Sequence, residues 1–213
     1  MTRRSELKKN FVDISKLIND PNGDSSLLPT YIVNKMIKEK SNVNIGGDGG
    51  DESFFGYITF DAFFLASKIK KIFPAFFLDL AGKFFSLKRD SYDYLTLTFK
   101  IKKFFNSINL DNKFLLPSWM SCLDAQNLSN LFNQKITESE IYENLDDIFS
   151  NEVNFMRSSQ LYHFKYYLPM ILSKVDQASM FNSVESRAPF LSKKVINFSL
   201  EQDVKSLYKI FRK

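Results

Sequence analysis

The sequence is poor in the residues that build disulfides and metal centres. Among its 213 residues it has one cysteine, Cys122, and one histidine, His163. A single cysteine excludes an internal disulfide and is typical of a reducing compartment. One residue of each kind also argues against a zinc site. Because His163 lies far from Cys122 in the sequence, a buried and unreactive thiol is a simpler interpretation than a nucleophile.

Long apolar runs are also lacking. The most apolar stretch, SFFGYITFDAFFLAS, contains Asp61 and is shorter than the about 20 residues that a membrane-crossing helix needs. The first ten residues, MTRRSELKKN, are basic with no apolar run behind them, so we expect no secretory leader. These observations predict a cytoplasmic protein with no membrane partner.

The charge balance is mildly basic, with a formal net charge of +5 and a pI near 9.1. A basic surface suits nucleotide phosphates or nucleic acid, but solvated helix faces explain scattered lysines more simply. The sequence contains no recognised nucleic-acid-binding motif, so we expect no nucleic-acid partner.

Helical periodicity covers most of the chain. A capping box at Thr137 and Glu140 marks one helix start, and NVNI (residues 42–45) is the best strand candidate because it is short, β-branched and ended by glycine. Only this stretch has a clear strand pattern, which is unusual because a strand needs a partner. The sequence predicts helices over residues 6–18, 26–40, 51–72, 152–167 and from about 192, with a largely helical stretch between 74 and 157.

The most distinctive stretch is GGDGGDE, directly after the predicted strand, where four of the seven glycines surround Asp48. Glycines at the carboxyl end of a strand let backbone N–H groups approach a ligand closely. The loop lacks the pattern of a Walker loop or of GxGxxG. Its carboxylates, Asp48 and Asp51, could converge on one pocket to hold Mg²⁺, accept a substrate ammonium or act as a base. A calcium loop or a plain acidic turn remains an equal alternative.

A second candidate lies in residues 174–191, where four charges stand among apolar and small residues. Lys174 could reach a phosphate as a point charge. Glu185 and Arg187 could position a substrate, or they could simply pair with each other before the turn at PFL.

Together, these stretches resemble the synthetase (ATP pyrophosphatase) domain of glutamine-hydrolysing asparagine synthetases. In that family a loop like SGDGGDELFGGY follows a strand, and a segment like KVDRASM…EARVPFLD comes much later. This sequence has GGDGGDESFFGY and KVDQASMFNSVESRAPFL, and its lead-in GDSSLLPTYIVNKM is similar to the family's preceding helix. The resemblance implies an α/β fold with an adenine-nucleotide α-hydrolase-like parallel sheet. One or two of its strands would lie in this mostly helical chain.

The resemblance also implies a ligase reaction. ATP adenylates the side-chain carboxylate of aspartate, pyrophosphate leaves, and ammonia from glutamine attacks the β-aspartyl-AMP. Carried over by motif, Gly46 and Gly47 would lie against ATP. Asp48 would support formation of the intermediate, and Asp51 would meet the amino group of aspartate. Lys174 would neutralise phosphate charge as pyrophosphate departs, and Mg²⁺ would bridge the phosphates.

Four positions depart from the family pattern. Gly46 replaces the usual serine, and Gln177 replaces a usual arginine or lysine, so a hydroxyl and a cation near the nucleotide are missing. Ser192 stands where PFLD has aspartate, and Phe55 stands where FGGY has its first glycine.

Two larger parts of the family pattern have no counterpart in the sequence: the glutaminase domain with its N-terminal cysteine, and the SGGxDSS loop that grips pyrophosphate. We therefore expect residues 1–213 to be the carboxyl-side part of a synthetase domain, inactive in isolation, with a separate chain supplying the missing parts. Two alternatives stay open. One is a non-catalytic remnant or interaction module, and the other is an amidotransferase for another carboxylate, such as a sugar or a β-lactam precursor.

Overall fold

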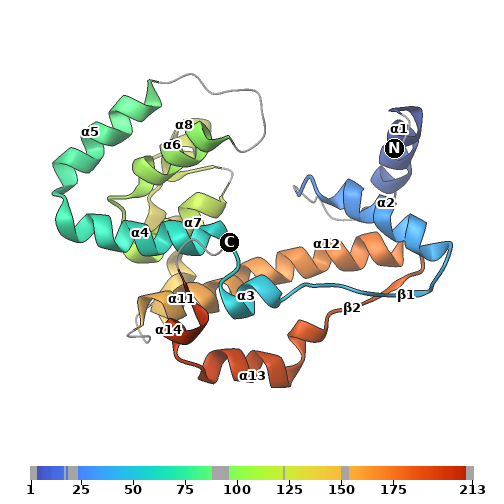
Figure 1. Ribbon diagram of the computed structural model, residues 1–213. Helices are drawn as coiled ribbons and strands as arrows, with labels where there is room; N and C mark the ends of the chain where they lie inside the picture. The colour runs from blue at the N-terminus through green and yellow to red at the C-terminus, as the bar shows by residue number, and fades with distance from the viewer. Residues whose placement is uncertain are drawn as a thin grey trace. The chain divides into compact units, whose positions relative to one another are not determined.

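A computed structural model shows the course of the chain (Figure 1) and describes residues 4–16, 18, 24–87, 96–121, 123–149 and 154–209. The described residues are mostly helical and contain one parallel sheet of two strands, which confirms the predicted fold class. They form two compact units. The first combines Met1–Gly56 with Tyr162–Tyr208, and the second comprises Tyr57–Leu161 with Lys209–Lys213.

The first unit contains the sheet and the helices that pack beside it. Buried positions of its second helix, Leu27, Tyr31 and Asn34, are four and three residues apart and therefore share one face. Leu27 and Tyr31 meet Ile14 and Ala178 in an apolar core. The elements are α1 (Arg4–Ser15), α2 (Leu27–Lys38), β1 (Val43–Ile45), α3 (Gly50–Phe54), the π-helical η2 (His163–Tyr167), α12 (Leu168–Met180), β2 (Glu185–Arg187), the 3₁₀ turn η3 (Pro189–Leu191), α13 (Lys193–Glu201) and α14 (Val204–Leu207).

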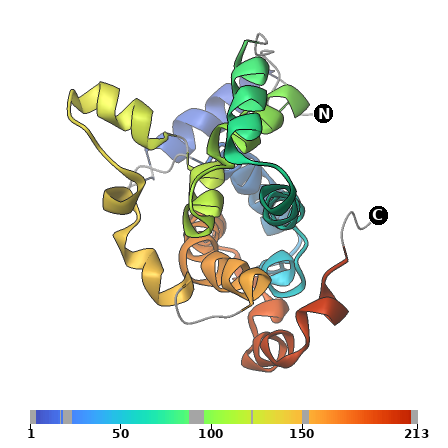
Figure 2. The same ribbon diagram turned by 90° about the vertical axis from the view of Figure 1, so that its left-hand side faces the viewer.

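The second unit is helical throughout its described part. Phe60, Phe63 and Ala66 follow one another at three-residue spacing on α4 and are fully buried. The Phe63 ring stacks on Phe155 and meets Trp119 edge-on. The elements, also drawn in Figure 2, are α4 (Ile58–Ile72), α5 (Ala75–Ser86), α6 (Leu97–Ser107), α7 (Asn112–Met120), α8 (Ala125–Phe132), α9 (Glu138–Ile141), η1 (Glu143–Leu145), α10 (Asp146–Phe149) and α11 (Phe155–Tyr162).

The sheet pairs β1 with β2 in parallel, with Val43 opposite Glu185 and Ile45 opposite Arg187. The central pair, Asn44 and Ser186, lies on the opposite face of the sheet and is polar. Ser186 donates through Oγ to Asn44 Oδ1 at 2.6 Å, and Asn44 Nδ2 donates to Asn34 of α2 at 2.7 Å. The predicted strand is thus confirmed, and it has a partner. Glu-Ser-Arg lacks the apolar pattern of a strand, which is why its sequence gave no strand signal.

Two helix predictions are wrong in their extent. The helix expected over residues 51–72 is two helices, α3 and α4, which are separated at Phe55–Tyr57. The helix expected to end near residue 167 instead continues through the π-helical η2 into α12. Pro169 follows directly after Leu168, whose N–H donates to the His163 carbonyl. The capping box at Thr137 and Glu140 is confirmed. Cys122, predicted to be buried, lies outside the described residues.

The break between α3 and α4 depends on an unusual backbone at Phe55. This residue has a left-handed conformation, with φ 57° and ψ 42°, which favours glycine. Its ring is nevertheless buried and meets the Tyr208 ring edge-on, with centroids 5.9 Å apart. The aromatic side chain that replaces the family's glycine therefore contributes burial at the cost of backbone strain.

Replacing Phe55 by glycine is expected to lower the free energy of unfolding by about 1–4 kcal/mol. Loss of a buried aromatic side chain costs about 3–5 kcal/mol, and relief of a left-handed backbone returns only about 1–2 kcal/mol. Urea unfolding measures the difference. Asn133→Gly is the matched control, because Asn133 has the same backbone conformation on an exposed helix end. A Phe55→Gly chain as stable as the parent would contradict this account.

Candidate functional site

The predicted glycine loop, residues 46–50, lies beside the turn that follows β2. Because the strands are parallel, their carboxyl ends meet at one edge of the sheet. The ladder continues one step further, where the Gly46 N–H donates to the Arg187 carbonyl oxygen at 2.8 Å. The two motifs that the sequence singled out are therefore brought together, although they are far apart in the chain.

The glycines of the loop are not equivalent. Gly49 has a φ of +89°, and a Cβ there would lie 2.2 Å from Cδ2 of Leu191, so glycine is required. Gly50 packs at an ordinary distance against Phe190. At Gly47 a Cβ would meet nothing within 4 Å, and the residue is exposed. Gly49 therefore joins the loop to the turn after β2, whereas Gly47 leaves its backbone open.

Asp48 and Asp51 contact different glycines. Asp48 Oδ2 lies 2.8 Å from the position that a Cβ would take on Gly46, so its carboxylate folds back over the start of the loop. Asp51 Oδ1 lies 1.9 Å from the corresponding position on Gly56, two residues before α4 begins. Asp51 is exposed and Asp48 is half-buried.

Lys174 is held by the segment before α2. Its Nζ donates to Asp24 Oδ2 at 2.9 Å and to Ser26 Oγ at 2.8 Å. The side chains of Lys174 and Asp24 are 10% and 21% exposed, so this ion pair is largely shielded from water. It fixes α12 to the start of α2.

The Asp24 carboxylate is also hydrogen-bonded locally. Both the backbone N–H and the hydroxyl of Ser26 donate to its Oδ1, at 2.8 and 2.7 Å. Burial raises the pKa of Asp24, but these hydrogen bonds and the Lys174 ammonium outweigh burial, so its pKa lies below the ordinary value.

Glu185 and Arg187 pair with each other on the outer face of the sheet. Their atoms Oε1 and Nη2 are 2.8 Å apart, and more than half of each side chain is exposed. The alternative that these residues form an ion pair is thus confirmed. A pair this exposed contributes little to stability, so both side chains remain available to a ligand.

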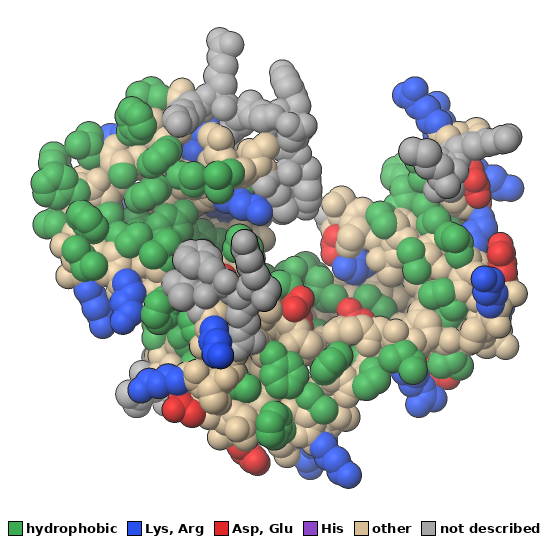
Figure 3. Space-filling model, in the orientation of Figure 1, with side chains coloured by type: hydrophobic (Ala, Val, Ile, Leu, Met, Phe, Trp, Pro, Cys, Tyr) green, Lys and Arg blue, Asp and Glu red, His purple; other side chains and the backbone are tan. Residues whose placement is uncertain are grey.

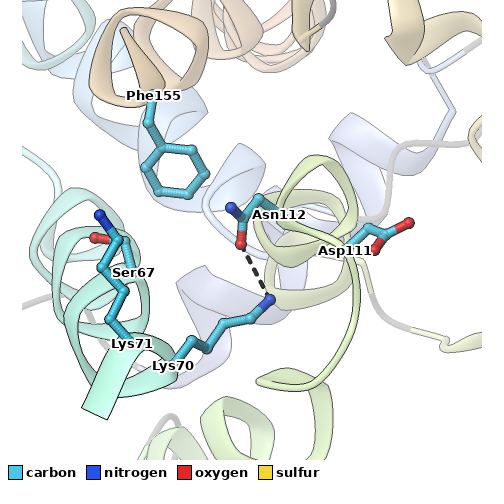
Figure 4. Close-up of a pocket in the computed structure, with 6 residues that line it drawn as sticks. All are labelled: Ser67, Lys70, Lys71, Asp111, Asn112 and Phe155. Carbon is cyan, nitrogen blue, oxygen red and sulfur yellow. Dashed lines mark hydrogen bonds between the residues drawn. The ribbon is translucent and has the colours of Figure 1, made fainter.

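None of the predicted site residues lines the cavity of about 300 Å³ in the second unit (Figure 4). There Lys70 Nζ donates to Asn112 Oδ1 at 3.0 Å and to the Leu110 carbonyl. Burial lowers the pKa of Lys70, partly offset by Asp111. The cavity is lined by Ser67, Lys70, Lys71, Asp111, Asn112 and Phe155.

The family model for asparagine synthase matches residues 2–210 of the chain. The chain belongs to the asparagine synthase family. It is also 38% identical over 76 residues to a protein of Methanocaldococcus jannaschii that is named as a glutamine-hydrolysing asparagine synthetase. That match covers 36% of this chain and 14% of the relative, so the matched part is a small share of the longer protein. No solved structure matches the chain.

For this member of the asparagine synthase family, sequence reasoning missed two sets of residues around the motifs. It did not single out Asp24 and Ser26, and the structure shows them as partners of Lys174. It also did not foresee that Leu191 packs on the loop at Gly49. Among the described helices, none is long and apolar enough to span a bilayer.

The substitution Gly49→Ala is expected to lower the free energy of unfolding by more than about 1 kcal/mol, because the left-handed backbone and the Leu191 contact both oppose a Cβ. The same substitution at Gly47, Gly47→Ala, is the matched control and is expected to change it by less than about 0.5 kcal/mol. Urea unfolding of both variants measures the contrast. Equal effects at the two positions would contradict the close packing of Leu191 on the loop.

The substitution Asp24→Asn is expected to lower the free energy of unfolding by about 1–3 kcal/mol at neutral pH, because it leaves Lys174 without its carboxylate. The folded-state pKa of Asp24 is depressed, so its stabilisation is present above the ordinary value of 3.8. It is lost as the pH falls through the lower folded-state pKa.

Urea unfolding gives the free energy of unfolding of the parent and of Asp24→Asn at each pH. The two values should converge as the pH falls through the acid range. Asp176→Asn, an exposed aspartate on the same helix, controls for loss of a charge on α12. It is expected to change the free energy by less than about 0.5 kcal/mol at neutral pH. If the two free energies of unfolding differed by the same amount at every acid pH, protonation of Asp24 would not be linked to stability.

Proposed function

We propose that the chain is the carboxyl-side part of an ATP-dependent asparagine synthetase domain. The reaction converts aspartate to asparagine through β-aspartyl-AMP, with ammonia that glutamine supplies. Family membership supports the reaction class. The observation that carries the assignment is the hydrogen bond from Gly46 N–H to the Arg187 carbonyl, which joins both family motifs at one edge of the sheet.

The glycine loop would contact the nucleotide. Gly46 and Gly47 would lie against ATP through their backbones, and the open surface at Gly47 supports this role. Asp48 would support formation of the acyl-adenylate. Asp51, an exposed residue, would accept a hydrogen bond from the amino group of aspartate.

The residues of the second motif would act on the phosphates and on aspartate. An ammonium has three N–H donors, and Lys174 uses two of them on Asp24 and Ser26. The third would donate to a phosphate oxygen as pyrophosphate leaves. Glu185 and Arg187 would position the substrate, since their mutual ion pair is exposed and easily exchanged for a ligand.

Magnesium would be bound mainly by the nucleotide. Among the described residues no group of three acidic, histidine or cysteine side chains could form a metal site. This arrangement fits Mg²⁺ held by phosphates with one or two carboxylates rather than by a protein cage. When bound, the ion would neutralise phosphate charge, and Asp48 and Asp51 are the carboxylates nearest to the proposed nucleotide site.

The reaction also needs a pyrophosphate-binding loop and a glutaminase, which would be supplied by polypeptide other than residues 1–213. The sheet supports this proposal. It has only two strands within the described residues, and Ile45 on its outer face is 78% exposed. A parallel sheet is normally covered on both faces, so this face would be completed by the missing polypeptide.

ATP–pyrophosphate exchange with aspartate and Mg²⁺ tests the proposal. We expect exchange when the chain is mixed with a polypeptide that carries the pyrophosphate loop, and none with either component alone. Asp48→Ala should abolish exchange in the mixture, and Glu39→Ala, which removes an exposed acid at the end of α2, should not. Absence of exchange in the mixture, with both components soluble and folded, would refute the assignment.

A further inference from the structure

Helix α5 has two apolar faces, and one of them is packed on α6. Leu78 and Gly82 are buried, and the Phe85 ring stacks on Phe105 with centroids 5.2 Å apart. At the other end of the contact, Asn109 Nδ2 donates to the Ala75 carbonyl at 3.1 Å. Figure 2 shows the two helices in the view turned by 90°. This face accounts for the usual amphipathic stripe of a surface helix.

The second apolar face, which includes the C-cap residue Leu87, is largely exposed within the described residues. Its large side chains are between 55% and 84% exposed. At 100° per residue they fall within an arc of about 100°, so they form one stripe. The stripe consists of Phe76, Phe77, Leu80, Phe84 and Leu87.

Exposed apolar side chains also lie on the neighbouring helices α4 and α6. Ile72 and Phe73, at the end of α4, are 71% and 51% exposed, and Leu97, at the start of α6, is 73% exposed. Figure 3 shows hydrophobic side chains gathered over α5 and α4, with lysine or arginine at their lower edge. A surface of this extent on a single chain marks an interaction site.

Basic residues accompany the stripe. Among residues 58–87 and 96–107, which the structure describes, seven lysines stand against two aspartates, a formal charge of +5. Lys83 is exposed and flanks the stripe on the α5 wheel, and Lys68 shares a face of α4 with Ile72, four residues away. The acids of the second unit come later, mostly at residues 138–152.

We propose that this surface, the α5 stripe with its flanking lysines, docks on an anionic lipid surface. Exposed phenylalanine and leucine beside lysine are the pattern of a helix that lies in the membrane interface. At about 1.5 Å per residue, α5 is roughly 18 Å long, too short to cross a hydrocarbon core of about 30 Å. The basic charge disfavours pairing of this face with the same face of a second copy and favours an anionic partner.

Vesicle flotation of the full chain tests the proposal, because a chain bound to vesicles floats whereas aggregates sink. The chain is expected to float with vesicles of phosphatidylcholine and phosphatidylglycerol and to stay behind with phosphatidylcholine alone. High salt should reduce flotation, since it screens the attraction of lysine to the surface.

Two substitutions separate the apolar and the charged contributions. Phe76→Ser combined with Phe84→Ser should lower the partition coefficient by about tenfold or more. Lys83→Gln should lower it roughly fivefold. Phe198→Ser and Lys194→Gln, at exposed positions of α13 in the other unit, are the matched controls and should leave it unchanged. Circular dichroism shows that every variant is folded.

Flotation that is equal with both vesicle types, or that the α13 controls reduce as strongly, would overturn the proposal. So would a chain that does not float and elutes as a dimer whose association Phe76→Ser and Phe84→Ser abolish, because the stripe would then bind a second copy. Binding to an acidic protein instead of lipid would also appear as absence of flotation and would have the same consequence.

Discussion

The parallel pairing of β1 with β2 is the contact on which the candidate site depends. Asn44 and Ser186, 142 residues apart, form the polar centre of this pairing. Asn34 of α2 receives a hydrogen bond from Asn44 and in turn donates to the Thr30 carbonyl at 2.9 Å. This chain of polar contacts specifies the register, because a shift by one residue would turn Val43 and Ile45 toward α2 and leave the polar groups unpaired.

The sequence predicts most elements whose signal is local. Helical periodicity, the capping box at Thr137 and the short β-branched strand each depend on neighbours within a few residues, and each is confirmed. The predicted helix boundaries are wrong where a tertiary contact overrides the conformational preference of a residue. Phe55 takes a left-handed backbone that its residue type disfavours, because burial of its ring against Tyr208 compensates. The sequence also does not predict strand β2, because β2 is extended through its pairing with β1 rather than through its composition.

The candidate site was predictable as a set of motifs but not as a set of contacts. Resemblance to a family points to the loop and to Lys174, and the structure adds their neighbours. Lys174 and Asp24 are 150 residues apart, and no periodicity relates them. The close approach of Leu191 to Gly49 is likewise a property of the folded loop. Glycine at residue 49 therefore has a packing reason that the string GGDGGD does not reveal, whereas glycine at residue 47 has none in the described chain.

The order of the two units along the chain has a consequence for synthesis on the ribosome. The second unit lies almost entirely between the two halves of the first. At about 5–20 residues per second, the segment between β1 and β2 takes roughly 7–28 s to emerge. Its local helical contacts form quickly, whereas β1 has to wait for a partner that is far away along the chain. Strand β1 is thus made early and paired late.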